Sequence, residues 1–253
     1  MSQSPIAERA RHWALWLTAH ASVTGSDGEK TLPAALAKEV RRTPLLADAE
    51  IFEIEAPDDP LGRTALAVFV RGSGDDCVLL TGHFDTVAVD DYGLRAPLAF
   101  APEQLREQIV QDLKDAKGKA ERLAHDDLAS GEFLPGRGLL DMKSGLAAGL
   151  AALEAFAATP NRRGNLLFVA VPDEEVNSHG ARALVAAVPD LDARFGIKVS
   201  AALNLDCIAD RGDGSEGRAI ALGSVGKVLL TALVIGRAAH ASHPFDGFNS
   251  SAL

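Results

Sequence analysis

The sequence predicts an α/β protein with a mainly parallel, mixed sheet flanked by helices, followed by the start of a second domain. Apolar strand-like runs alternate with segments whose apolar residues recur at helical spacing, which is typical of parallel α/β sheets. Glycine and alanine are plentiful whereas only 5% of the residues are aromatic, and this favours helices packed closely on a sheet. With 253 residues, 47% of them hydrophobic, the chain can bury the core of one large or two small domains.

The first part of the chain predicts two helices and three strands. Residues 4–20 carry apolar side chains at helical spacing, and residues 31–43 predict a second helix with Pro33 in its first turn. The strand at residues 77–83 is apolar on both faces, as expected of a central strand. Together the three predicted strands are residues 49–56, 64–72 and 77–83.

Residues 87–136 interrupt this alternation. They are polar and helix-prone, so we expect an inserted surface excursion with one or two helices. After it, alternation resumes with a small-residue helix at 142–158, a strand at 165–172, a helix at 180–188 and a strand at 199–206.

From about residue 216 the pattern changes again. Two long strand runs surround a glycine-containing turn, which indicates a different domain. We therefore expect a first domain at residues 1–215 and the beginning of a second at 216–253.

Composition excludes several classes of function. The formal net charge is −10 and the pI is about 5.1, so no basic surface for nucleic acid is expected and an anionic membrane would repel the chain. No apolar run reaches the length of a membrane span, and the N-terminus lacks the layout of a signal peptide. We expect a cytoplasmic protein in which Cys77 and Cys207 are buried, reduced thiols.

Polar side chains follow the apolar runs where each strand ends. In open α/β sheets, ligands bind at the carboxyl ends of the strands. One histidine and several carboxylates therefore converge at one edge of the predicted sheet: His83, Asp85, Asp141, Asp173, Glu174, Glu175 and Asp206.

Each of these residues also has an ordinary structural explanation. His83 alone suits a buried core histidine, Asp141 suits a helix cap, and the acidic triplet suits a solvated loop. Together, however, carboxylates at one edge would raise one another's pKa values and destabilise the fold unless a cation offsets their charge. Histidine with carboxylates suits Zn²⁺, with Co²⁺ or Mn²⁺ as substitutes.

Four segments, in this order, resemble the signatures of the M20 family of metallopeptidases and deacylases. They are GHFDTV, GRGLLDMKSG, VAVPDEEVNSHGA and GRAAHASHPFDGFNSSA. The family includes aminoacylases, di- and tripeptidases, carboxypeptidases and succinyl-diaminopimelate desuccinylase, and the insertion resembles its arginine-utilisation subgroup. The resemblance implies a zinc-exopeptidase-like catalytic domain, an α+β lid domain through which homodimers form, and hydrolysis of an amide bond in a peptide or N-acyl amino acid.

The resemblance also implies metal ligands. His83 and Asp206 would hold one cation, Glu175 would hold a second, and Asp141 would bridge the two Zn²⁺ ions of a complete site. The peptide bond from Asp141 to Met142 would be cis.

Three further residues would act in catalysis. Glu174 would be the general base that takes a proton from the metal-activated water. Asp85 would orient the His83 ring through a hydrogen bond. His240, in the lid, would stabilise the oxyanion. Asp173 receives no role from the resemblance, and we expect His179 at the surface.

In the family, a late histidine completes the metal site on the Glu175 side, and this chain stops before any counterpart. We therefore expect an N-terminal part of a longer protein that binds at most one metal well and hydrolyses little alone. The alternative is a non-catalytic scaffold or binding protein built on the same fold, which need not hold zinc. A metallophosphoesterase is disfavoured because no arginine or lysine cluster accompanies the carboxylates.

Overall fold

The computed structural model describes residues 4–208, 220–223, 233–237, 239–240 and 242–248. The chain divides into two compact units, Met1–Cys207 and Ile208–Leu253. The predicted boundary between residues 215 and 216 lies outside the described residues and stays a prediction.

The first unit is built on one five-stranded sheet with the order β1-β2-β4-β3-β5. β2 pairs antiparallel with both β1 and β4, whereas β3 pairs parallel with both β4 and β5. Four strands therefore share one direction and β2 alone opposes them, which confirms the predicted mixed and mostly parallel sheet. The strands are β1 (Glu50–Glu55), β2 (Thr64–Val70), β3 (Ser73–His83), β4 (Arg163–Val171) and β5 (Lys198–Asn204).

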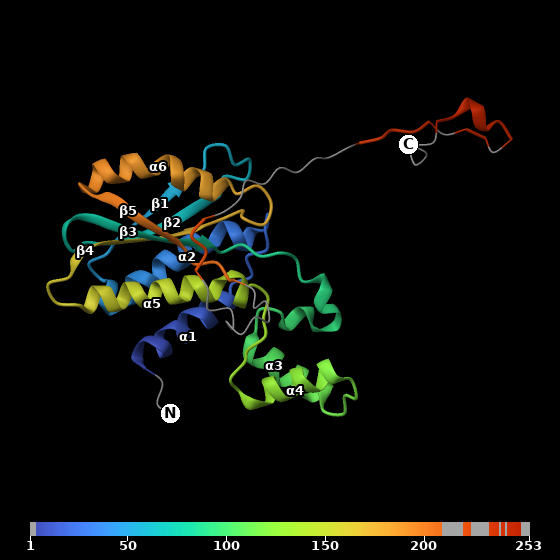
Figure 1. Cartoon of the computed structure of the whole chain (residues 1–253), viewed down its shortest axis with the longest axis horizontal. Coiled ribbons are helices and arrows are strands. Elements are labelled where there is room, and N and C mark those ends of the chain that lie inside the picture. The colour runs from blue at the N-terminus through green and yellow to red at the C-terminus, as the bar shows by residue number, and fades with distance from the viewer. Residues whose placement is uncertain (1–3, 209–219, 224–232, 238, 241, 249–253) are drawn as a thin grey trace. The chain divides into compact units, whose positions relative to one another are not determined.

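Helices cover both faces of the sheet (Figure 1). On one face lie α1 (Pro5–Thr18), α2 (Asp27–Arg42) and α5 (Ser144–Ala158), and on the other lies α6 (His179–Phe195). The alternation of strand side chains creates the two cores. In β4, for example, Phe168 packs in the core with α1, α2 and α5, while Leu167 and Val169 pack in the core with α6.

The insertion contains a 3-10 segment, η2 (Asp90–Leu98), and two α-helices, α3 (Pro102–Leu113) and α4 (Lys119–Ser130). Neither η2 nor α4 buries a residue, and α3 buries only Pro102 and Leu105. The segment thus contains two α-helices that bury few residues, and its assignment as an insertion stays a prediction.

Two predicted helices have wrong boundaries. α2 begins at Asp27, so Pro33 lies in its interior rather than its first turn. The reason is the cap, because the Ser26 hydroxyl accepts a hydrogen bond from the amide of Glu29 at 3.2 Å, as Ser-x-x-Glu caps do. α6 continues past residue 188 to Phe195 because Leu191 and Phe195 extend its buried face. A short 3-10 turn, η1 (Pro44–Leu46), follows α2.

In the second unit, the described residues include a 3-10 turn, η4 (Pro244–Asp246), and a bridge between Arg237 and Phe248. The two predicted strand runs lie largely outside the described residues, and their described parts, 220–223 and 233–236, are not in strands.

The two cysteines are free, and only Cys77 is buried. Cys207 is exposed because it lies beyond the end of β5, so the expectation of two buried thiols is wrong for this residue. Within the described residues, none of the helices combines the length and apolar character needed to cross a membrane.

Candidate metal centre

The site lies at the carboxyl ends of three neighbouring parallel strands. β3 ends at His83 and lies between β4 and β5. His83 is in register with Val171 at the end of β4, and Thr81 is in register with Asn204 at the end of β5. The amide of Leu205 donates to the carbonyl of Thr81 at 2.8 Å, which keeps the segment after β5 beside β3. The residues that follow these strands therefore meet at one edge, as the sequence predicted.

Three of the predicted ligands are brought together. Ligand atoms of His83, Asp141 and Asp206 all lie within 4.8 Å of one another. The Nε2 atom of His83 lies 3.2 Å from Oδ1 of Asp141. His83 is buried whereas the Asp141 side chain is 59% exposed, so the group is open on one side. One imidazole nitrogen and two carboxylates with an open side fit a catalytic divalent cation such as Zn²⁺.

A tight turn places Asp141 at this edge. It lies in η3 (Leu139–Lys143), a one-turn π-type segment directly before α5. The Asp141–Met142 peptide bond is cis, as the resemblance implied. The Met142 side chain is buried, and its sulfur accepts a hydrogen bond from the amide of His83 at 3.0 Å.

Asp206 owes its place to a close approach between the chain after β5 and the first turn of α5. A side chain on Gly145 would put its Cβ 2.0 Å from the carbonyl oxygen of Leu205. The sequence must therefore carry glycine at this position for the Asp206 segment to reach His83.

Asp85 holds the His83 ring from behind. The Nδ1 atom of His83 lies 3.0 Å from the main-chain oxygen of Asp85 and 3.5 Å from its carboxylate. Burial acts to lower the pKa of His83, but the contacts with Asp85 and the charge of Glu174 outweigh it and raise this pKa to about 9. The negative charge around His83 therefore favours the protonated, positively charged imidazole.

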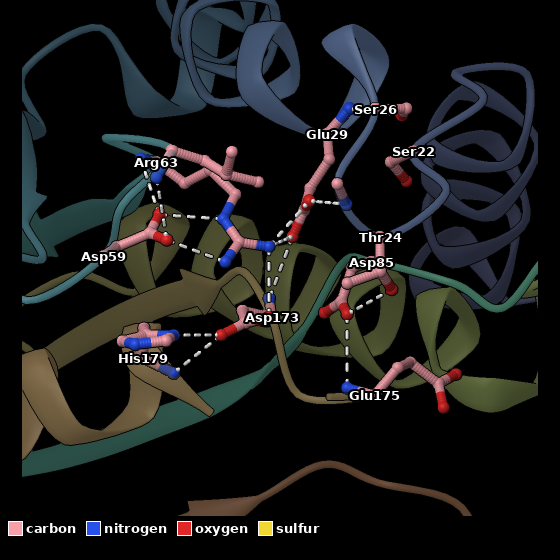
Figure 2. A network of polar contacts seen from close by, with 12 residues as sticks. Ser22, Thr24, Ser26, Glu29, Asp59, Arg63, Asp85, Asp173, Glu175 and His179 are labelled. Atoms are coloured by element: carbon pink, nitrogen blue, oxygen red, sulfur yellow. Dashed lines mark hydrogen bonds and ion pairs between the residues drawn. The ribbon is translucent and has the colours of Figure 1, made fainter. Parts of the chain in front are cut away.

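The buried Asp85 carboxylate also holds the acidic loop, which consists of residues 173–175 after β4 (Figure 2). It accepts hydrogen bonds from the amide of Glu174 at 3.0 Å, the amide of Glu175 at 3.2 Å and the hydroxyl of Thr24 at 2.9 Å. Burial acts to raise the pKa of Asp85, but His83, the amide of Glu174 and the hydroxyl of Thr24 outweigh it and lower the pKa. Asp85 is thus a carboxylate shared between the histidine and the loop.

The two glutamates of the loop lie in different surroundings. Oε2 of Glu174 lies 3.7 Å from Nε2 of His83, and the Glu174 side chain is 47% exposed. Glu175 lines a pocket of about 240 Å³ together with Asp141, Thr86 and Arg137. Burial and then the nearby carboxylates raise the pKa of Glu175, although the charge of His83 acts in the opposite direction. Glu174 is therefore the more accessible carboxylate beside the histidine, and Glu175 faces the pocket.

The predicted role of His240 falls in the second unit. There its Nδ1 atom lies 2.7 Å from the hydroxyl of Ser242. Its part in catalysis stays a prediction.

Sequence reasoning missed a buried ion network next to the loop, made by Glu29, Asp59, Arg63, Asp173 and His179 (Figure 2). The expectation that His179 lies at the surface is wrong, because its side chain is only 13% exposed and pairs with Asp173. The Ser-x-x-Glu pattern of residues 26–29 was one available signal for Glu29, since it marks a helix start.

The sequence pattern of Peptidase family M20/M25/M40 matches residues 79–223. The chain is 34% identical over 242 residues to protein YqjN of Bacillus subtilis, covering 93% of this chain and 42% of that protein. It is 31% identical over 248 residues to protein RocB of the same organism, covering 96% of this chain and 43% of RocB. The chain thus spans less than half the length of these relatives.

Among solved structures, human carnosine dipeptidase 1 is similar in fold. It has a TM-score of 0.53 at 15% sequence identity, and the match covers 81% of this chain and 40% of that chain. This likeness concerns the fold of the sheet and its helices.

Proposed function

Because the chain belongs to Peptidase family M20/M25/M40, we propose that it carries the metal-binding part of a hydrolase that cleaves an amide bond in a peptide or N-acyl amino acid. The observation that carries the proposal is the group formed by His83, Asp141 and Asp206 at one edge of the sheet. This donor set of nitrogen and carboxylate oxygens suits Zn²⁺, with Co²⁺ or Mn²⁺ as substitutes.

The proposed chemistry divides the work among neighbouring residues. A divalent cation held by the group would polarise the substrate carbonyl and activate the attacking water. Glu174 would accept the proton of that water, since its carboxylate lies beside His83 and is accessible from solvent. Asp85 keeps the His83 ring oriented. His240 would stabilise the oxyanion.

In this proposal Glu175 and Asp141 would hold a second cation in a complete active site. Both line the pocket beside the first group. Among the described residues, the group of His83, Asp141 and Asp206 is the only set of three metal-capable side chains this close together. We therefore expect the chain by itself to bind one Zn²⁺ tightly and to hydrolyse amides only slowly. A cytoplasmic location and a homodimer formed through the second unit belong to the same proposal.

Isothermal titration with Zn²⁺ tests this assignment. We expect one tight site per chain, a loss of affinity of about 100-fold or more in His83→Ala, and an unchanged stoichiometry in Glu174→Gln. Two tight sites per chain, or rapid hydrolysis of dipeptides or N-acyl amino acids, would contradict the single-site expectation. A chain that binds no Zn²⁺ would instead favour the non-catalytic scaffold.

A further inference from the structure

Arg63 is the centre of the buried ion network beside the acidic loop (Figure 2). Its side chain is only 4% exposed. Nε and Nη2 donate to the two carboxylate oxygens of Asp59, each at 2.8 Å. Nη1 donates to both carboxylate oxygens of Glu29, at 3.1 and 3.0 Å. The same Nη1 atom lies 3.1 Å from Oδ1 of Asp173. One guanidinium thus joins carboxylates from α2, from the β1–β2 connection and from the end of β4.

Asp173 connects this network to the acidic loop. It is 1% exposed and directly precedes Glu174. Its φ of 68° lies in the left-handed region, which a residue other than glycine rarely adopts, so surrounding contacts must hold it there. Its carboxylate supplies such contacts, because it pairs with Arg63 on one side and with the amide and Nδ1 of His179 on the other.

Three successive backbone amides of the loop donate to buried carboxylates. The amide of Asp173 donates to Glu29 at 2.9 Å, and those of Glu174 and Glu175 donate to Asp85. Glu29 and Asp85 are both fully buried. Arg63 fixes Glu29, and Asp85 also contacts His83, so the two acceptors tie the loop to the ion network and to the metal centre respectively.

We propose that Arg63 is a positioning residue that, through Glu29 and Asp173, holds the backbone of residues 173–175 so that the Glu174 carboxylate faces His83. This inference rests on the proposed function for the role of Glu174. A network that served stability alone would need no contact with the loop, whereas this one holds the amide and the carboxylate of Asp173 at the same time.

Arg63→Lys is the decisive variant, because it keeps the positive charge but loses the fork that spans Asp59 and Glu29. Arg9→Lys is its matched control. Arg9 makes a similar two-pronged contact with the buried Glu154 on α5, at 2.9 and 2.8 Å, as part of the packing of α1 on α5. Circular dichroism and thermal unfolding establish that each variant is folded, and Asp173→Asn replaces Arg63→Lys if the latter does not fold.

The first readout is amide hydrogen exchange in the metal-free chain, measured by mass spectrometry. In Arg63→Lys, we expect the amides of residues 173–175 to exchange about tenfold faster than in the unmodified chain, while those of central β4 do not change. In Arg9→Lys, exchange at residues 173–175 stays as in the unmodified chain. Unchanged exchange at these amides in a folded Arg63→Lys, or equal acceleration in Arg9→Lys, overturns the proposal.

The second readout is the pH dependence of the visible spectrum of the chain loaded with Co²⁺. Glu174→Gln removes the charge of this side chain and should move the midpoint pH of the spectral change by about one unit. Arg63→Lys should move the midpoint in the same direction, and Arg63→Lys combined with Glu174→Gln should move it no further than Glu174→Gln alone. Additive shifts would overturn the positioning role. If Glu174→Gln leaves the midpoint unchanged, the proposed role of Glu174 fails, and the exchange measurement alone decides the role of Arg63.

Discussion

Asp85 is the residue through which the proposed metal centre and the acidic loop of residues 173–175 depend on each other. It is fully buried and lies against the His83 ring, and its carboxylate accepts hydrogen bonds from the amides of Glu174 and Glu175. Uncharged groups in its place would leave both the ring and the loop with weaker partners.

We predict that Asp85→Asn lowers the Zn²⁺ affinity of the chain about 10- to 100-fold, because the proposed ligand His83 loses the negative charge 3.5 Å from its Nδ1 atom, although the contact with the main-chain oxygen remains. Thr24→Ser is the control, since it retains the hydroxyl that donates to Asp85. Isothermal titration measures both variants. Affinity in Asp85→Asn equal to that of the unmodified chain would show that the carboxylate does not support His83.

Asp59 should contribute to the loss of folding stability in acid. Hydrogen bonds from Arg63 outweigh burial and lower the pKa of Asp59 from its ordinary value of 3.8. A carboxyl group with a lower pKa in the folded state stabilises the fold above its unfolded pKa, and this contribution is lost as the pH falls through the folded value. The unmodified chain should therefore lose stability below about pH 4.

Urea unfolding at several pH values measures this loss. Asp59→Asn has no carboxyl group to titrate, so its stability should fall less steeply below pH 4. Asp58→Asn is the control, because Asp58 is exposed and lies next to Asp59 in the chain. An equal slope in Asp59→Asn and the unmodified chain would contradict the expected contribution of Asp59.

At the scale of elements, α5 places two of the proposed ligands. Its N-terminus follows the turn that carries Asp141, and its first residues lie against the segment that carries Asp206. We predict that Gly145→Ala destabilises the chain by about 1–3 kcal/mol, because the added Cβ forces Leu205 away. Zn²⁺ affinity should fall as well, since Asp206 moves with Leu205.

Chemical denaturation and Zn²⁺ titration test both effects. Ala148→Ser is the control, because Ala148 lies on the exposed face of the same helix and should change stability by less than about 0.5 kcal/mol. A Gly145→Ala chain that is as stable as the control and binds Zn²⁺ equally well would contradict the close-approach argument.

The sequence predicted the strands, the helices within residues 87–136 and the edge where the proposed ligands meet, because these depend on local patterns. A strand followed by His83 and another followed by Glu174 and Glu175 place those residues at one edge once the strands are parallel. The network around Arg63 was not predictable, because its members come from three separate parts of the chain and are recognised only when those parts pack together. The predicted helix began at residue 31 because proline is typical of a first helical turn, whereas the Ser26 cap starts α2 at Asp27.

At the scale of the whole first unit, one sheet joins two cores, one facing α6 and the other facing α1, α2 and α5. Because alternate residues of the same strands form both cores, we expect this unit to unfold in a single transition. Leu184→Ala, in α6, should cost about 2–5 kcal/mol. The unfolding transition followed by tryptophan fluorescence should shift together with the one followed by circular dichroism. This is expected although both tryptophans lie in α1, on the other face of the sheet from α6. A fluorescence transition that stays in place would show that the two cores unfold independently.

In our proposal, the ends of β3 and β5 and the turn before α5 together hold a divalent cation. Diffraction from crystals of the chain grown with Zn²⁺, measured at the zinc absorption edge, tests this claim most directly. We predict an anomalous peak about 2.1 Å from Nε2 of His83, with carboxylate oxygens of Asp141 and Asp206 at about 2.0–2.2 Å. A chain saturated with Zn²⁺ that shows no peak among these three residues, or a peak only elsewhere, would contradict it.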